Sequence, residues 1–410
     1  MFEVNKVRQD FPLLKKAGES SKPLIYLDNA ATTLKPQSVI DAVTRYYTDY
    51  SVNIHRGDYD LSYQVSDYYE KTRKTVASFI QADVNEVVFT AGASASLNLV
   101  AYGYGEKYIQ ENDVILSTES EHASSILPWF RVASQKKASI EYVPLTEDGQ
   151  ITIENFKHAM HTKVKVVVIA HISNVLGYVV PIKELSEIAH SFGAIVIVDG
   201  AQSVPHIQTR VKDWDIDFLA FSAHKMYGPT GVGVLYGKYQ LLDSIEPYYL
   251  GGGSNARFDR CGNITLKNPP YKFEAGTPAI EAVLGLKAAI EYIESIGFDA
   301  IEKVEHELRT YLINHLKEFK HIKLYNPDAT SGIVTLNAIG IPSQDAAIYL
   351  NSKGIMVRAG NHCAKILLDV LKTPDTIRIS LSFYNTKAEC DAIIEALREI
   401  TLEKCIDLIF

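Results

Sequence analysis

The stretch VKVVVIAH at Val164–His171 is an almost continuous apolar run, and AIVIVD at Ala194–Asp199 repeats the pattern. A strand that is buried on both faces has this composition, whereas a strand with one wet face alternates apolar and polar residues. Between the two runs, Ile182–Phe192 carries its apolar residues at helical spacing. Strands that alternate with helices in this way predict an α/β fold with a mainly parallel sheet covered by helices.

The same alternation extends outward from this stretch. Further strands are expected at Glu86–Thr90, Asp113–Ser117, Asp217–Ser222 and Gly233–Tyr236. After a long helical pattern at Ala279–Ser295 the strands become fewer, and they are expected at Ile333–Ile339, Ile355–Gly360 and Thr376–Phe383. We therefore expect a large domain over residues 26–280, a smaller α+β C-terminal domain over residues 281–410, and an N-terminal segment, residues 1–25, that packs on the small domain.

The composition is that of an ordinary soluble chain. The 410 residues are 47% hydrophobic and 22% charged, with a net charge of -8, so no broad attraction to nucleic acid or anionic lipid is expected. No apolar run reaches the ~18 residues that a membrane span needs. The N-terminus, MFEVNKVRQDFPLL, lacks the pattern of a signal or transit peptide. We expect a cytoplasmic protein with no nucleic-acid or membrane partner.

The motif FSAHKMYGPTGVG at Phe221–Gly233 ends an apolar strand in Ser222, His224 and Lys225. A lysine at a strand end among small residues can be partly desolvated, which lowers its pKa and lets the amine form an imine. Ser222 and His224 are placed to hydrogen-bond a phosphate beside it. The alternative for the motif alone is a surface lysine in a turn.

The motif VDGAQSVPH at Val198–His206 places Asp199 at the end of a buried strand. A carboxylate there needs a partner, because burial would otherwise neutralise it. The protonated ring nitrogen of pyridoxal phosphate is such a partner, and an anionic Asp199 would keep that nitrogen protonated. The alternative is an aspartate that caps the next helix.

Two further turns follow strands. In TAGASAS, Thr90–Ser96, small residues would let backbone N–H groups approach a phosphate at a helix N-terminus, although a simple capped turn has the same composition. In STESEHASSILPW, Ser117–Trp129, His122 could stack on a flat aromatic cofactor or could be an ordinary histidine.

The chain has four cysteines, none at CxxC spacing, so neither a disulfide framework nor a metal site is expected. In VRAGNHCAK, Val357–Lys365, Cys363 is flanked by Arg358, His362 and Lys365. Nearby cations favour the thiolate, which is the nucleophilic form of cysteine. The alternative is a buried structural thiol.

Arg378 lies within the strand pattern TIRIS. An arginine inside a strand is costly unless it is paired, and a substrate carboxylate offers a partner that can accept two hydrogen bonds from the guanidinium group.

Taken together, these motifs resemble the class V aminotransferase family of fold-type I pyridoxal-phosphate enzymes, and within it the group II, SufS-like cysteine desulfurases. The resemblance runs nearly end to end, and it includes YLDNAATTLKP (Tyr26–Pro36), HRG (His55–Gly57), HISNVLG (His171–Gly177), GGG (Gly251–Gly253), FEAGTP (Phe273–Pro278), RAGNHCA and IRISLSFYNT (Ile377–Thr386). It implies a large domain with a mainly parallel seven-stranded sheet.

The resemblance also implies roles in holding pyridoxal 5'-phosphate. Lys225 would carry the cofactor as a Schiff base, Asp199 would pair with the ring nitrogen, Gln202 would hydrogen-bond the ring hydroxyl and His122 would stack on the ring. Ser94, Ser222 and His224 would hold the phosphate. Thr277 would reach the phosphate of the neighbouring subunit, so a homodimer is implied.

For the reaction, the resemblance implies conversion of L-cysteine to L-alanine with a persulfide on Cys363 and protonation through His122. Asn174, which would also contact the cofactor, and Arg378 would orient the substrate carboxylate. Arg358, His55 and Arg56 would line the entrance. A protein would accept the sulfur, and iron–sulfur cluster assembly is the route expected by analogy.

The chain departs from the family pattern in four places. Ala93 and Ala95 replace the usual polar residues of the phosphate turn, Ala123 and Asn361 each replace a histidine, and residues 254–263 differ from the usual dimer-contact hairpin. The alternatives are therefore a selenocysteine lyase, another class V aminotransferase or C–S lyase, and a weakly catalytic scaffold for sulfur carriers.

Overall fold

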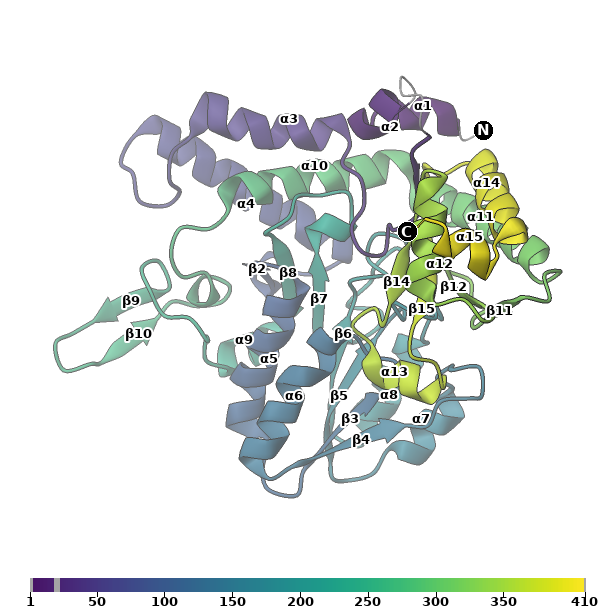
Figure 1. Cartoon of the computed structure of the whole chain (residues 1–410). Coiled ribbons are helices and arrows are strands. Elements are labelled where there is room, and N and C mark those ends of the chain that lie inside the picture. The colour runs from purple at the N-terminus through teal and green to yellow at the C-terminus, as the bar shows by residue number, and fades with distance from the viewer. Residues whose placement is uncertain (1–2, 18–22, 409–410) are drawn as a thin grey trace.

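The computed structural model describes residues 3–17 and 23–408. Its largest element is a seven-stranded sheet with the order β2-β8-β7-β6-β5-β3-β4 (Figure 1). Its strands are β2 (Val87–Thr90), β3 (Val114–Thr118), β4 (Ser139–Val143), β5 (Val164–Ala170), β6 (Ile195–Asp199), β7 (Phe218–Ser222) and β8 (Gly233–Gly237). β8 runs antiparallel to both of its neighbours, β2 and β7, and the other pairs of the sheet are parallel. The predicted α/β fold with a mainly parallel sheet is therefore confirmed.

Both faces of the sheet are buried, as the apolar runs predicted. On β5, Val166 and Val168 pack in one cluster while Val167 and Ile169 pack in another, because successive side chains of a strand point to opposite faces. The first face is covered by α5 (Ala93–Tyr108), α6 (Ala123–Lys136) and α9 (Tyr239–Ser244). The second face is covered by α4 (Asp60–Ile80), α7 (Ile153–Ala159), α8 (Ile182–Ser191) and α10 (Ile280–Ile296), with α3 (Gln37–Arg45) packed on α10.

The edge strand β4 was not predicted. Its residues alternate between exposed and partly buried before the buried Val143, so it lacks the apolar run that marks the central strands.

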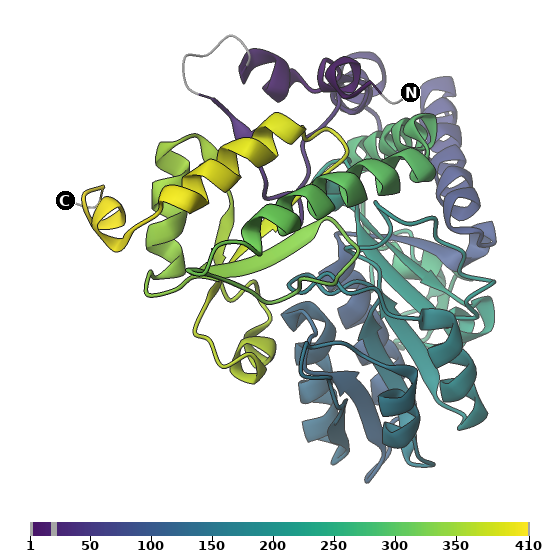
Figure 2. The same cartoon turned by 90° about the vertical axis from the view of Figure 1, so that its right-hand side faces the viewer.

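A second, antiparallel sheet has the order β11-β12-β15-β14. Its strands are β11 (Ile322–Leu324), β12 (Ile333–Ala338), β14 (Arg358–Gly360) and β15 (Thr376–Ser380), and the helices beside it are α11 (Phe298–Leu316), α12 (Ser343–Ser352), α14 (Lys387–Glu399) and α15 (Leu402–Ile406). Figure 2 shows this group beside the large sheet. The short α13 (Lys365–Val370) follows the loop that holds Cys363.

The N-terminal segment contacts both cores. Phe11, between α1 (Val4–Arg8) and α2 (Pro12–Ala17), packs in the core of the large sheet, while Arg8 forms an ion pair of 3.0 Å with Glu389 on α14. The strand β1 (Ile25–Tyr26) pairs in parallel with β13 (Ile355–Met356). The apolar face of α10 also belongs to the core of the large sheet, and the division at residues 25 and 280 stays a prediction.

A hairpin of β9 (Asn255–Phe258) and β10 (Ile264–Leu266) projects away from both cores (Figure 1). Within residues 3–17 and 23–408, the helices are too short or too polar to cross a membrane.

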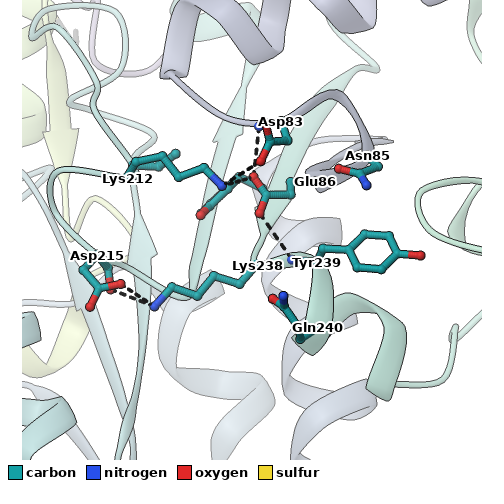
Figure 3. A pocket seen from close by; sticks show the side chains of 10 residues that line it. Asp83, Asn85, Glu86, Lys212, Asp215, Lys238, Tyr239 and Gln240 are labelled. Carbon is teal, nitrogen blue, oxygen red and sulfur yellow. Dashed lines mark hydrogen bonds and ion pairs between the residues drawn. The ribbon is translucent and has the colours of Figure 1, made fainter.

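At the amino-terminal edge of the large sheet, charged side chains surround a hollow of about 600 Å³ (Figure 3). Lys238 lies 2.6 Å from Asp215 and 2.9 Å from Asp217. His190, at the end of α8, approaches the same two carboxylates at 3.1 and 2.8 Å. The hydrogen bond to Asp217 raises the pKa of His190, although burial opposes the shift.

The raised pKa predicts a pH-dependent stability. The contribution of His190 should be fully present below its unfolded pKa of about 6.5 and should be lost as the pH rises through the higher folded pKa. His190→Gln should therefore lower the free energy of unfolding by up to about 1 kcal/mol near pH 5.5 and by less near pH 8.5. Urea titrations at both pH values measure this, with the exposed His306→Gln as control. An equal loss at both pH values would contradict the prediction.

Candidate functional site

Lys225 and Asp199 follow adjacent parallel strands at the carboxyl edge of the large sheet. Asp199 ends β6, and Lys225 lies in a 3-10 turn, η3 (Ala223–Lys225), directly after β7. Burial lowers the pKa of Lys225 to about 8; Asp199 opposes the shift, and Arg378 and Arg358 add to it. About a tenth of the molecules therefore carry Lys225 as a neutral, nucleophilic amine at pH 7, far more than for an exposed lysine.

The carboxylate of Asp199 is only 6% exposed. Its two oxygens accept hydrogen bonds from the Ser125 hydroxyl at 2.8 Å and from the Ala201 N–H at 2.9 Å. Both donors are neutral, and a buried carboxylate is stable only if positive charge lies nearby. Asp199 is therefore suited to face a cationic ring nitrogen.

Next to Lys225, glycines bring strands and the start of α5 close together. A Cβ atom on Gly233 would lie 2.4 Å from the Cα atom of Gly92, so only glycine fits there. The Ser222 hydroxyl accepts a hydrogen bond from the Ala93 N–H at 2.7 Å, and Ser94, which is exposed, lies 2.6 Å from Ser124. This turn supplies hydroxyl groups and the N-terminus of a 16-residue helix, which suit a phosphate.

His224 lies on the same turn as Lys225. Burial lowers the pKa of His224 to about 4, and the charges of Lys225 and Lys35 add to the shift. A neutral imidazole can still donate one hydrogen bond to an anion, but His224 does not add a positive charge there at neutral pH.

The loop with Cys363 is fastened to the turn with His122. The Ala123 N–H donates a hydrogen bond of 2.7 Å to the Cys363 carbonyl oxygen. Asn361 accepts a bond of 3.1 Å from the Cys363 N–H. His122 caps α6 by accepting a bond of 3.1 Å from the Ser124 N–H, and burial together with the charge of Lys225 lowers its pKa. The loop of the exposed Cys363 is thus held against the turn of the partly buried His122.

The flanking residues of Cys363 differ from the expectation. His362 is buried, with Nε2 lying 2.9 Å from the Thr376 hydroxyl, and burial lowers the pKa of His362 to about 3. Lys365 is paired with Asp369 on the surface. The expectation that His362 supplies a cation is therefore wrong, because its ring is neutral and enclosed. Of the three cations expected near Cys363, Arg358 remains. It lies opposite Arg378 in the antiparallel pair β14–β15.

Arg378, on β15 of the small sheet, is only 2% exposed. Its Nη1 donates to the Asn174 carbonyl oxygen at 2.9 Å, and its Nη2 donates to Asp28 at 3.1 Å. Within the described part of the chain its Nε has no hydrogen-bond partner. The Asn174 side chain donates to the His362 carbonyl oxygen at 2.8 Å. An unused N–H on a buried guanidinium is suited to an incoming carboxylate.

Gln202, on the loop after β6, is buried and donates a hydrogen bond of 2.8 Å to the Ala30 carbonyl oxygen. Its side-chain amide therefore lies at the junction of the VDGAQ and NAATT motifs.

Three expected site residues lie in a separate cluster. Thr277 accepts a hydrogen bond of 3.2 Å from Asn53, His55 lies 3.3 Å from Glu70, and the guanidinium of Arg56 rests against the backbone of Gly252. The described contacts of His55, Arg56 and Thr277 are with neighbours such as Glu70, Gly252 and Asn53, and none is with Lys225. A hollow of about 520 Å³ lies among them.

Three contacts of the site had no signal in the sequence pattern. Asp28 pairs with an arginine 350 positions away, Ser125 differs in no obvious way from other helix serines, and Ala123 acts through its backbone. Only the folded chain brings these groups to the site.

The residues around Lys225 fit pyridoxal phosphate. They offer an amine of lowered pKa, a buried carboxylate for a ring nitrogen and a narrow, hydroxyl-lined turn for a phosphate. Within residues 3–17 and 23–408, no cluster of three or more His, Cys, Asp or Glu side chains could hold a metal ion.

Comparisons with known proteins point to one family. Residues 25–393 match the family described as Aminotransferase class-V. A protein of Halalkalibacterium halodurans named probable cysteine desulfurase is 44% identical over 396 residues, covering 96% of this chain and 97% of the relative. One of Staphylococcus aureus with the same name is 43% identical over 401 residues, covering 97% of each.

Solved structures agree. The apo structure of a cysteine desulfurase from Thermococcus onnurineus superimposes with a TM-score of 0.92 at 38% identity, covering 97% of this chain and 98% of that chain. The cysteine desulfurase CsdA of Escherichia coli, in an S-sulfonic acid form, gives a TM-score of 0.90 at 33% identity, covering 100% of this chain and 99% of that chain.

The burial of the cysteines predicts their reactivity. Cys261 and Cys363 are exposed, whereas Cys390 and Cys405 are buried, and burial raises the pKa of Cys390 to about 12. Iodoacetamide should therefore alkylate the first pair in the native protein at least about 100-fold faster than the second. Peptide mass spectrometry over a time course checks this, and labelling in urea gives the control in which all four react. Comparable native labelling of Cys390 would contradict the described packing.

Proposed function

The chain belongs to the class V aminotransferase family, as its motifs predicted, and on that premise we propose that it is a pyridoxal-phosphate-dependent cysteine desulfurase. The observation that carries the proposal is the fastening of an exposed cysteine beside a buried Lys–Asp pair. The Ala123 N–H to Cys363 carbonyl bond of 2.7 Å joins the loop of the thiol to the turn of His122, whose pKa already responds to the charges of Lys225 and Asp199.

Bound at this site, pyridoxal phosphate would supply an electron sink for the α-carbon of an amino acid. Lys225 would attach it and then take the proton from that carbon, because an amine with a pKa of about 8 is partly neutral at cellular pH. Asp199 would hold the positive charge of the ring nitrogen, and Ser125 would orient Asp199 by its 2.8 Å bond. Ser94, Ser222, His224, Gln202 and His122 would complete the cofactor site.

Cys363 would act as the sulfur acceptor. Its thiolate attacks the sulfur of L-cysteine, so that a sulfur–sulfur bond forms while the carbon–sulfur bond of the substrate breaks. The electron pair of the broken bond stays with the carbon fragment, which gains a proton, through His122, and leaves as L-alanine. The net change is one cysteine and one thiol converted to one alanine and one persulfide.

Arg378 and Asn174 would orient the substrate. The free Nε of Arg378 and the fixed geometry of its guanidinium suit the α-carboxylate. Arg358 lies opposite Arg378 on β14 and would line the same entrance.

A homodimer is part of the proposal. Tyr248, Tyr249 and Leu250 are all more than half exposed, and Tyr249 reaches 70%. Tyr248 and Tyr249 border a hollow of about 770 Å³ that extends to Ser94 and to the FEAGTP turn. A large exposed aromatic patch is typical of a subunit interface. Across such an interface, His55, Arg56 and Thr277 would serve the site of the neighbouring subunit, which explains why they cluster apart from Lys225.

The sulfur would pass from Cys363 to a protein acceptor, and iron–sulfur cluster assembly is the proposed destination. The support is the exposure of Cys363, because a second protein can reach a thiol at the surface, together with the family resemblance.

Removing the thiol tests the proposal. In Cys363→Ala, the release of alanine from L-cysteine with a reductant present should fall at least about tenfold, because no thiolate accepts the sulfur. Chromatography of the amino acids measures alanine, and Cys261→Ala, which removes the other exposed thiol, should match the wild type. Equal alanine from Cys363→Ala would remove Cys363 from the mechanism, and pyruvate with ammonia in place of alanine would point to a C–S lyase. Alanine from neither enzyme, with activity on selenocysteine, would favour a selenocysteine lyase.

The substrate-binding role of Arg378 gives a separate prediction. Arg378→Lys keeps the positive charge but loses the planar fork, so KM for L-cysteine should rise by roughly tenfold or more while kcat changes less. Steady-state kinetics with a matched Arg398→Lys control, at an exposed position on α14, measures the difference. An unchanged KM would remove Arg378 from the carboxylate site.

A further inference from the structure

Arg73, in the middle of α4, is completely buried. Its guanidinium donates to both carboxylate oxygens of Glu274, at 2.6 and 2.9 Å, and its Nε donates to Glu70 at 3.0 Å. The Val87 carbonyl oxygen accepts a further bond of 2.9 Å. Each nitrogen of the Arg73 guanidinium thus donates at least one hydrogen bond to another residue.

Aromatic rings enclose the same guanidinium. The rings of Phe89, Tyr69 and Tyr271 lie 4.7, 5.5 and 5.5 Å from it. Cation–π contacts of this kind strengthen when water is excluded, so the rings hold Arg73 in one orientation.

Arg73 reaches two other segments of the chain, one directly through Glu274 and the other through Glu70, which lies on α4 like Arg73 itself. Glu274 lies in the FEAGTP turn, three residues before Thr277, and it also accepts a bond of 2.9 Å from the Phe89 N–H on β2. Glu70 lies 3.3 Å from His55 of the HRG loop. Although burial opposes it, hydrogen bonds from His55 and Arg73 lower the pKa of Glu70 to about 2. Arg73 therefore connects both segments through charged carboxylates.

Stability alone does not explain this arrangement. A buried ion pair is often no more stabilising than well-packed apolar side chains, because each charge must be desolvated. What a fixed fork between two carboxylates provides is geometry, since bidentate hydrogen bonds set both distance and orientation. The geometry that it sets here is that of the FEAGTP turn against the HRG loop, which also meet where the Gly276 N–H donates to Gly252 and Arg56 rests on Gly252.

We infer that Arg73 is a positioning residue for the active site, and that it acts through Glu274 on Thr277 and through Glu70 on His55. The inference rests on the proposed function, in which Thr277 reaches the cofactor phosphate of the neighbouring subunit. Arg73 itself touches neither substrate nor cofactor. It fixes the two segments that would cross the subunit interface.

The test compares Arg73→Lys with Arg309→Lys. Arg309 is a second buried arginine, 4% exposed, whose contacts are main-chain carbonyl oxygens of Asn326 and Pro327 in the small domain. For each variant, pyridoxal phosphate affinity of the cofactor-free protein is measured by absorbance titration, together with Tm, subunit mass by light scattering, and the KM and kcat for L-cysteine.

We expect Arg73→Lys to weaken cofactor binding by about tenfold or more and to raise KM, because lysine cannot hold two carboxylates in one plane. Arg309→Lys should lower Tm by about as much as Arg73→Lys does, but it should leave cofactor affinity within about twofold of the wild type. Equal cofactor affinity in Arg73→Lys and the wild type, or an equal loss in both variants, would overturn the inference. A loss that follows dissociation into monomers would also overturn it.

If Arg73→Lys does not fold, two isosteric variants test separately the connection through Glu274 and the connection through Glu70. Glu274→Gln should weaken cofactor binding, whereas Glu70→Gln should raise KM and leave cofactor affinity unchanged. The reverse pattern, or no change in either, would overturn the inference. Failure of the proposed function is distinguishable, because the wild type would then release no alanine while the cofactor titrations still report on Arg73.

Discussion

A carboxylate buried at the end of a parallel strand must face positive charge. The arrangement of the site around Asp199 follows from this requirement. Hydrogen bonds from two neutral donors, the Ser125 hydroxyl and the Ala201 N–H, hold the side chain of Asp199 in place. Lys225, one strand away, responds to that charge while burial lowers the pKa of its amine. The parallel sheet is what makes the pair possible, because adjacent strands end at the same edge and bring a carboxylate and an amine together from residues 26 positions apart.

The small sheet completes the site by contacts of long sequence separation. Arg378 reaches Asp28 and the Asn174 carbonyl oxygen, and Asn174 in turn holds the loop of Cys363. The two bonds of Asn174 cross between the sheets, so the position of the thiol depends on how the small sheet packs beside the large one. The apolar contact of Leu176 and Tyr178 with Tyr325 and Leu367 supports the same junction.

Much of the fold could be predicted from the sequence, because strands buried on both faces leave continuous apolar runs. β4 could not, since its exposed residues interrupt the pattern. Lys225 and Asp199 could be placed because each ends such a run. The neutral state of His362 could not, because it depends on enclosure beside Thr376, and the partners Asp28, Ser125 and Ala123 carry no local signal. A sequence pattern reflects the local structure of consecutive residues, whereas these contacts join residues that are distant in the sequence and meet only in the folded chain.

Consecutive left-handed residues, His362 and Cys363 with φ of 52° and 58°, shape the loop of the thiol. Together with the backbone bonds at Ala123 and Asn361, this tight bend leaves little slack on either side of the sulfur. If Cys363 carries sulfur, as proposed, a thiol on such a short tether would not swing out to meet a distant acceptor. In the proposed function, a protein acceptor would therefore have to bring a flexible segment of its own to the surface beside Cys363.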